Sequence, residues 1–117
     1  MKVADIAAEL PREARQRPYI RRLEIHEQTS SLIKTRLIIS PDIFVQIYRN
    51  DRFDSTNLAL IHNQRRIYGR DHLGSSWHRH ITSDPSAHDR SIPGRIAVTL
   101  SVFLDEVESV MAELGLP

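Results

Sequence analysis

The sequence contains no cysteine, which excludes disulfide bonds, thiolate metal sites and cysteine nucleophiles. Glycine is scarce, and none of the four glycines belongs to a phosphate-binding loop, a dinucleotide fingerprint or a serine nucleophile elbow. Long apolar runs are also missing. No stretch approaches the roughly 18 residues of a membrane span, and the N-terminus lacks the apolar core of a signal peptide. We therefore expect a cytoplasmic protein that has no membrane partner.

The overall charge indicates no partner, because 16 lysine and arginine residues are balanced by 15 aspartate and glutamate residues. The charges are nevertheless unevenly spread along the chain. Residues 62–95 contain arginines at six positions and aspartates at three, whereas residues 99–117 contain four carboxylates and no basic residue. The middle of the chain and its C-terminal end therefore carry opposite net charges.

The length of 117 residues and the apolar content of 40% fit a single domain with a modest core. We predict an α+β fold, in which a five-stranded antiparallel meander has an N-terminal helix and a C-terminal amphipathic helix packed on one face. The expected segments are an N-terminal helical part over 1–18, the sheet over 20–82, a loop over 83–97 and a helix over 99–115.

Particular residues define the two expected helices. Pro11 should separate a short first helix from a second helical turn. Thr99 or Ser101 should cap the last helix, and Gly115 should end it. Apolar residues recur at helical spacing between these caps, which favours a helix lying across the sheet.

The strand-like runs 56–63 and 65–72 meet at Asn63-Gln64, which fits a two-residue hairpin turn. This turn places Leu60 opposite Ile67, and the following hairpin places Asp71 opposite His78 and Gly69 opposite His80. Because side chains alternate between the faces of a strand, two sets follow. One face should carry Leu58, Leu60, Ile67, Gly69, Asp71, His78 and His80. The other should carry Ala59, Ile61, Arg66, Tyr68, Arg70, His72, Trp77, Arg79 and Ile81.

The stretch WHRHITSDPSAHD, residues 77–89, holds three of the six histidines. His78 and His80 share a strand face about 7 Å apart, and this spacing gives two ligands to one metal ion. His88 is the third candidate metal ligand, and Asp71 or Asp89 could complete a site for zinc or a similar divalent ion. The alternative is a polar strand end whose imidazoles form hydrogen bonds with nearby carboxylates. We expect no cofactor unless these histidines bind such a metal.

The same segment also contains the residue types needed for acid–base catalysis. Metal-free RNA cleavage requires a base, an acid and a cation for the phosphate. The candidate catalytic residues are His78, His80, His88, Arg79 and Asp71.

A third possibility is nucleic-acid binding without catalysis. Arginine and aromatic side chains on one sheet face would supply phosphate contacts and stacking surfaces. The candidates are Arg66, Tyr68, Arg70, Trp77 and Arg79. The structural alternative is that the aromatic residues pack beneath a helix while arginine stems cover them.

The run LALIHNQRRIYGRDHLGSSWHRHITSDPSAHD resembles a small family of uncharacterised prokaryotic proteins. Its members carry an RIYG-x-D hairpin, an H-x-HP-x-x-x-P-x-x-H segment and a S-x-x-x-F-x-x-x-V helix. The matching residues are Arg66, Ile67, Tyr68, Gly69, Asp71, His78, His80, Pro85, His88, Phe103 and Val107. The chain departs from the pattern at Ile81, where the family has proline.

More distantly, the chain is similar to the TumE-like family, placed among the toxins of toxin–antitoxin pairs, which has its own histidine-rich stretch before a C-terminal helix. The resemblance implies a small α+β domain, a toxin acting on RNA and an antitoxin protein as partner. Three function classes stay open, and with them whether the protein is an enzyme. They are a toxin-like RNA-binding protein or ribonuclease, a non-catalytic interaction domain that forms a homodimer, and a small metal-dependent enzyme.

Overall fold

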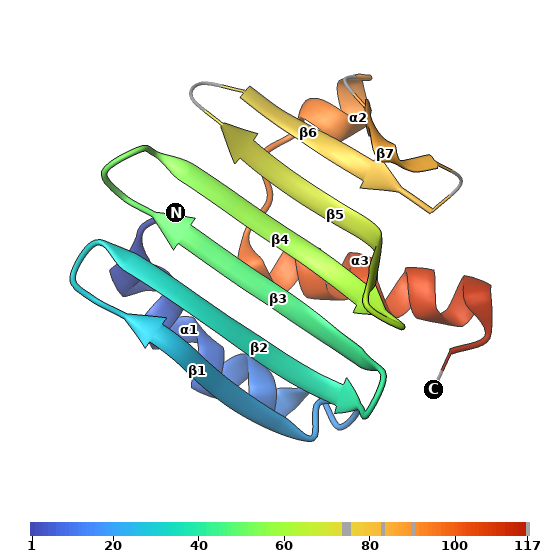
Figure 1. Cartoon of the computed structure of the whole chain (residues 1–117), viewed down its shortest axis with the longest axis horizontal. Coiled ribbons are helices and arrows are strands. Elements are labelled where there is room, and N and C mark those ends of the chain that lie inside the picture. The colour runs from blue at the N-terminus through green and yellow to red at the C-terminus, as the bar shows by residue number, and fades with distance from the viewer. Residues whose placement is uncertain (74–75, 83, 90, 117) are drawn as a thin grey trace.

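The computed structural model describes residues 1–73, 76–82, 84–89 and 91–116, with the backbone alone for residues 84–88. Its strands form one antiparallel sheet in the order of the sequence, β1 to β7, and helices lie behind it in the view of Figure 1. The elements are α1 (Val3–Gln16), β1 (Arg22–Gln28), β2 (Leu32–Ser40), β3 (Ile43–Asn50), β4 (Ser55–His62), β5 (Arg65–Leu73), β6 (Ser76–Ile81), β7 (Asp84–Asp89), α2 (Ile92–Arg95) and α3 (Leu100–Leu114).

The α+β class, the antiparallel sheet and the helix at each end are confirmed, but the predicted number of five strands is wrong. Six strands lie between residues 20 and 82, and β7 occupies part of the segment expected to be an irregular loop. β7 pairs with β6 although it contains a proline. Proline is tolerated there because β7 is the last strand of the sheet, so its outer edge needs no ladder hydrogen bonds.

The expected break in the N-terminal helix is also wrong, because α1 runs through Pro11 without interruption. A proline inside a helix costs about 3 kcal/mol through its missing N–H and its ring. The apolar residues Val3, Ile6 and Leu10 on the inner face are all buried against the sheet, and this packing offsets the cost. None of the helices in the described ranges combines the length and apolar character needed to cross a membrane.

α1 and α3 cover the same side of the sheet, which we call the helix side (Figure 1). Strand alternation directs Leu37, Val45 and Leu60 to this side, where they pack with Phe103 and Val107 of α3. α3 begins at the Thr99 cap, whose hydroxyl accepts a hydrogen bond from the Val102 N–H, and ends at Gly115 in the left-handed conformation. The opposite side of the sheet faces the viewer in Figure 1, and we call it the open side.

The hairpin between β4 and β5 determines which side chains reach each side. Asn63 and Gln64 both have positive φ, so the predicted two-residue turn is present. Directly after it, a β-bulge at Ile67 places Leu60 opposite Tyr68 instead of Ile67. The predicted grouping of Leu58 and Leu60 with Asp71 is therefore wrong. These leucines share the helix side with Tyr68 and Arg70, while Ala59, Ile61 and Arg66 share the open side with Asp71.

Candidate functional site: a buried cluster of two histidines and an aspartate

Asp71, His78 and His80 meet on the open side of β5 and β6. The predicted register of this hairpin is confirmed, since Asp71 pairs with His78 and Gly69 with His80. The Oδ2 atom of Asp71 lies 2.8 Å from Nε2 of His80 and 3.4 Å from Nε2 of His78. One ligand atom from each residue lies within 4.8 Å of the other two. We call these three residues the Asp–His cluster.

The cluster is buried although it lies on the side that α1 and α3 do not cover. The exposed fractions are 7% for Asp71, 3% for His78 and 0% for His80. The two imidazole rings are 5.5 Å apart between centroids and inclined at 66°, so both can direct a nitrogen toward one point without stacking. Buried ionisable groups must be paired or bind a cation, and here they are arranged around a single carboxylate oxygen.

Neighbouring strands hold the carboxylate of Asp71 in position. Asn57, its partner on β4, donates a hydrogen bond from Nδ2 to Oδ1 over 2.6 Å. The guanidinium of Arg66 lies 3.6 Å from Oδ2, and about a third of this side chain is exposed. Gly69 leaves room for Arg66, because a Cβ at this position would lie 3.3 Å from Cδ of Arg66 and 2.9 Å from the carbonyl oxygen of Leu58.

The remaining candidates from residues 77–89 are distributed differently. Arg79 points to the helix side, where its Nε donates to Oδ2 of Asp89 over 2.8 Å. Hydrogen bonds from Ser91, reinforced by Arg79, lower the pKa of Asp89 to about 2. Asp89 and Arg79 therefore satisfy each other away from the Asp–His cluster. The side chain of His88, proposed as a catalytic residue and a metal ligand, lies outside the described residues.

The predicted nucleic-acid candidates do not form an exposed platform, because four of the five point to the helix side. Tyr68 stacks on Phe103 at 5.9 Å and donates its hydroxyl to Glu106. Arg70 is 4% exposed and binds Glu106 through two nitrogens and the carbonyl of Pro93 through a third. Trp77 stacks on His72 at 5.0 Å. Only Arg66 reaches the open side.

The pairing of Arg70 with Glu106 brings together the two segments of opposite charge. Acidic residues of α3 bind arginines from other parts of the chain: Glu106 binds Arg70, while Asp105 and Glu108 bind Arg17, the residue directly after α1. These ion pairs connect α3 to the sheet and to α1. Of these pairs, Arg70 with Glu106 joins the two segments of opposite charge.

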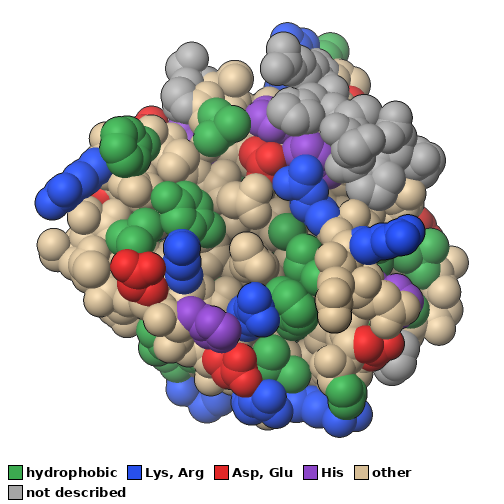
Figure 2. Space-filling model, viewed as in Figure 1, with side chains coloured by type: hydrophobic (Ala, Val, Ile, Leu, Met, Phe, Trp, Pro, Cys, Tyr) green, Lys and Arg blue, Asp and Glu red, His purple; other side chains and the backbone are tan. Residues whose placement is uncertain are grey.

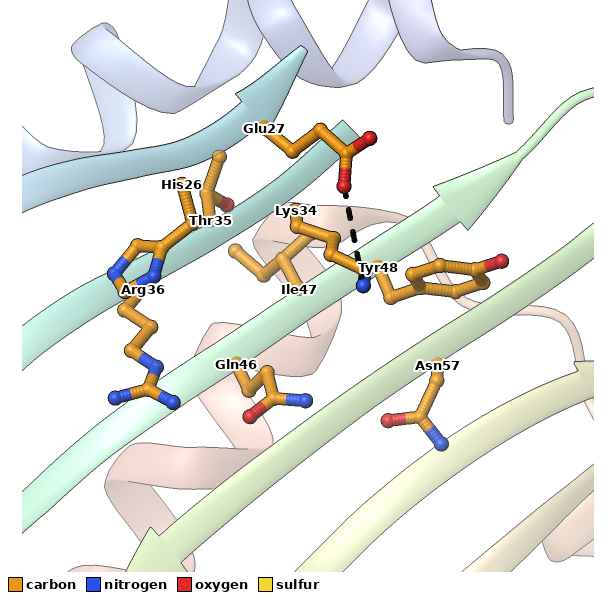
Figure 3. A pocket seen from close by; sticks show the side chains of 9 residues that line it. All are labelled: His26, Glu27, Lys34, Thr35, Arg36, Gln46, Ile47, Tyr48 and Asn57. Atoms are coloured by element: carbon orange, nitrogen blue, oxygen red, sulfur yellow. Dashed lines mark ion pairs between the residues drawn. The ribbon is translucent and has the colours of Figure 1, made fainter. Parts of the chain in front are cut away.

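The open side contains a second feature that was not identified from the sequence. A cleft of about 680 Å³ lies over β1 to β4 and is lined by His26, Glu27, Lys34, Thr35, Arg36, Gln46, Ile47, Tyr48 and Asn57 (Figure 3). Lys34 and Arg36 of β2, and Gln46 and Tyr48 of β3, lie at alternate positions, a period-two signal that is visible in the sequence. Asn57 belongs to this cleft and also contacts Asp71, so the cleft adjoins the Asp–His cluster.

Comparisons with known proteins found no match: no family model, no curated protein and no solved structure resembles this chain closely enough to count. The similarity to the TumE-like family consequently stays a prediction. Any functional assignment rests on the geometry of the open side.

Proposed function

We propose that the protein is a small metal-dependent hydrolase whose single divalent metal ion is bound by Asp71, His78 and His80. The observation that carries this proposal is the convergence of Nε2 of both histidines on Oδ2 of one aspartate. Two imidazoles and one carboxylate form a common ligand set for zinc, iron and related transition metals.

Two distances within the cluster fit such a site. Ligand atoms about 2.1 Å from an ion are about 3.0 Å apart in octahedral and about 3.4 Å apart in tetrahedral coordination. The separations between Asp71 and the two histidines, 2.8 and 3.4 Å, are close to these values. Small rotations of the side chains would therefore admit an ion. The hydrogen bond from Asn57 would orient the carboxylate, as partners of metal ligands commonly do.

The geometry favours a metal over a metal-free pair of catalytic histidines. In acid–base cleavage of a phosphodiester, the base and the acid act on different oxygens, so the two groups must lie on different sides of the substrate. Here both imidazoles approach the same oxygen of Asp71, and His80 is 0% exposed. This arrangement leaves no space for a substrate between the two rings.

Three protein ligands leave a coordination position for water or substrate, and a metal in such a site acidifies the water and polarises a phosphoryl or carbonyl oxygen. Arg66 lies beside Asp71 with part of its side chain exposed, so its guanidinium can bind an anionic substrate group next to the cluster. A phosphate ester has both the anionic oxygens and the electrophilic centre that this pair of features requires.

Isothermal titration of the metal-free protein with zinc, cobalt and manganese tests the proposal. We expect one ion per chain, and we expect Asp71→Asn and His80→Ala to abolish this binding. His62→Ala is the matched control, because His62 also lies near an aspartate, 3.5 Å from Asp42, but outside the cluster. Circular dichroism should confirm that each variant is folded, and Asp71→Asn keeps the shape of the side chain if His80→Ala does not fold.

Hydrolysis of a chromogenic phosphodiester tests the enzymatic part. The metal-loaded protein should hydrolyse it, whereas the chelator-treated protein and Asp71→Asn should not. The proposal is wrong if no metal binds, if binding survives in Asp71→Asn, or if hydrolysis is unaffected by removal of the metal.

A further inference from the structure

Two rows of side chains cross the open side from β2 to the Asp–His cluster. Because residues opposite each other in a sheet point to the same side, the strand registers define the rows directly. The first row is Lys34, Tyr48, Asn57, Asp71 and His78. The second row is Arg36, Gln46, Ala59, Gly69 and His80. At about 4.8 Å per strand, each row is about 19 Å long.

We call the surface over these two rows the groove. Ala59 and Gly69 add almost no side-chain bulk to the second row, and the Arg66 side chain lies against Gly69. The guanidinium of Arg66 lies in this part of the groove, near Asp71. At the other end the groove enters the cleft of about 680 Å³ over β1 to β4. The groove therefore leads from two cations on β2, past a third on β5, to the cluster.

The charges along the groove favour a polyanion. Lys34, Arg36 and Arg66 are its basic residues, and Asp71 is the one carboxylate that the described parts of β2 to β6 direct to this side. Asp71 is 7% exposed and already bound by its neighbours. Figure 2 shows lysine and arginine side chains spread over the strands of this side.

Two carboxylates of the edge strand β1 also border the groove. Glu24 is bound by Arg22 and His26, while Glu27 lies 3.9 Å from Nζ of Lys34, the ion pair drawn in Figure 3. Glu27 therefore partly neutralises Lys34 and should weaken the binding of a polyanion.

Aromatic rings accompany the two cations on β2. Nζ of Lys34 lies 5.9 Å from the centroid of the Tyr48 ring, and Cζ of Arg36 lies 4.4 Å from that of Phe44. Both rings are partly exposed. Alternating cations and partly exposed rings bind the phosphates and unstacked bases of single strands.

We propose that the groove binds single-stranded RNA, with phosphates on Lys34, Arg36 and Arg66 and a base stacked on Tyr48. A duplex fits poorly, because its bases are not available to stack on a ring. The polar side chain of Gln46 lies between the cations and the cluster, where it can form a hydrogen bond with a ribose 2′-hydroxyl, which favours RNA over DNA. The proposal deepens the proposed hydrolase, since it names the substrate class, but RNA binding itself does not require the metal.

Fluorescence anisotropy with a labelled RNA strand of about ten nucleotides, in the presence of a chelator, tests the proposal. We expect Lys34→Gln combined with Arg36→Gln to weaken binding at least about 10-fold, and Arg66→Gln and Tyr48→Ala each to weaken it as well. The matched control removes two exposed arginines of α1, Arg12→Gln with Arg15→Gln, and should leave binding unchanged. Glu27→Gln should strengthen binding.

Salt dependence and competing strands sharpen the test. Three phosphate contacts predict a slope of about −2 for the logarithm of the binding constant against that of the salt concentration, or about 20-fold weaker binding between 50 and 200 mM salt. Single-stranded DNA and duplex RNA of the same sequence should bind more weakly. The proposal would be overturned if single-stranded DNA or duplex RNA bound as tightly as single-stranded RNA. It would also be overturned if the α1 control lost as much RNA affinity as the Lys34/Arg36 variant, or if no RNA bound at all.

The variants separate this proposal from the proposed hydrolase. The Lys34/Arg36 variant should bind the metal as the wild-type protein does, whereas Asp71→Asn should lose the metal and still bind RNA. If the wild-type protein binds RNA but no metal, the hydrolase is wrong and the RNA proposal stands. If it binds the metal but no RNA, the substrate class is wrong and the hydrolase stands.

Discussion

Nε2 of His80 lies 2.8 Å from Oδ2 of Asp71, on the neighbouring strand and nine positions earlier in the chain. His78, which lies directly opposite Asp71 on β6, approaches the same oxygen. A buried histidine beside an aspartate is often part of a structural hydrogen-bond network, but two imidazoles and a carboxylate with ligand atoms within 4.8 Å of one another also supply the ligand set of a metal site. This relationship is the basis of the proposed hydrolase.

The first prediction concerns the residue that holds Asp71. Asn57→Ala removes the 2.6 Å hydrogen bond to Oδ1 of Asp71 and should weaken metal binding about 10- to 100-fold, as is usual when a partner of a metal ligand is lost. Gln46→Ala changes a neighbouring position on the same side and should have no effect. Titration calorimetry compares the two variants, and equal affinities would show that Asn57 does not orient the carboxylate.

The second prediction concerns Gly69. An alanine Cβ there would lie 2.9 Å from the backbone oxygen of Leu58, so the two strands would have to separate locally. We expect Gly69→Ala to lower the free energy of unfolding by about 1–3 kcal/mol, measured by urea denaturation. Adding Arg66→Ala should not restore stability, because the contact with the backbone oxygen remains. Full restoration would show that the flexible side chain was the obstacle.

The third prediction concerns the ion pair between the sheet and α3. Glu106→Gln leaves the buried guanidinium of Arg70 without its charged partner, and we expect it to lower the free energy of unfolding by about 2–3 kcal/mol. Glu113→Gln, an exposed position of the same helix, should change stability by less than about 0.5 kcal/mol. Similar denaturation midpoints for the two variants would refute this role of Glu106.

The fourth prediction concerns alkaline pH. Burial, with Glu106 as the next cause, raises the pKa of Tyr68 to about 12, and burial with Glu108 raises the pKa of Tyr19 to about 12. Both phenols ionise at about 10 in the unfolded chain, so their contribution to stability is complete below pH 10 and is lost as the pH rises toward 12. Urea midpoints should fall over this interval. The fall should be smaller in a variant with Tyr19→Phe and Tyr68→Phe, and an unchanged fall would contradict the assignment.

The fifth prediction follows from the similarity to the TumE-like family that the sequence predicts, together with the proposed RNA groove. Expression of the wild-type chain in bacteria should arrest growth, and His78→Ala or His80→Ala should relieve the arrest at equal protein levels. Harmless expression of a folded wild-type protein would argue against a toxin.

Local sequence patterns were sufficient for several parts of the fold. The spacing of Phe103, Val107 and Met111, with Thr99 before them and Gly115 after them, predicted α3 closely. The register of β5 with β6 was also predicted, because a short loop leaves antiparallel strands little freedom to slip. Asp71, His78 and His80 were consequently placed on one face before their distances were known.

Other parts depend on tertiary contacts that the sequence does not display. The bulge at Ile67 directs Tyr68 and Arg70 toward α3, and no turn motif in the sequence indicates this bulge. On α3, Tyr68 stacks on Phe103 and Arg70 binds Glu106. α1 passes through Pro11 because its packing outweighs a local preference. The same bulge explains why the arginines and aromatic residues of β5 and β6 do not form the expected nucleic-acid surface. The cations and rings that we propose to bind RNA lie mainly on β2 and β3 of the open side.

The most direct test of the central claim is anomalous X-ray diffraction from crystals grown with cobalt or zinc, measured at the absorption edge of the metal. The proposed hydrolase predicts one strong peak about 2.0–2.2 Å from Oδ2 of Asp71 and from Nε2 of both His78 and His80. A peak only at another histidine, or no peak in crystals saturated with the metal, would contradict it.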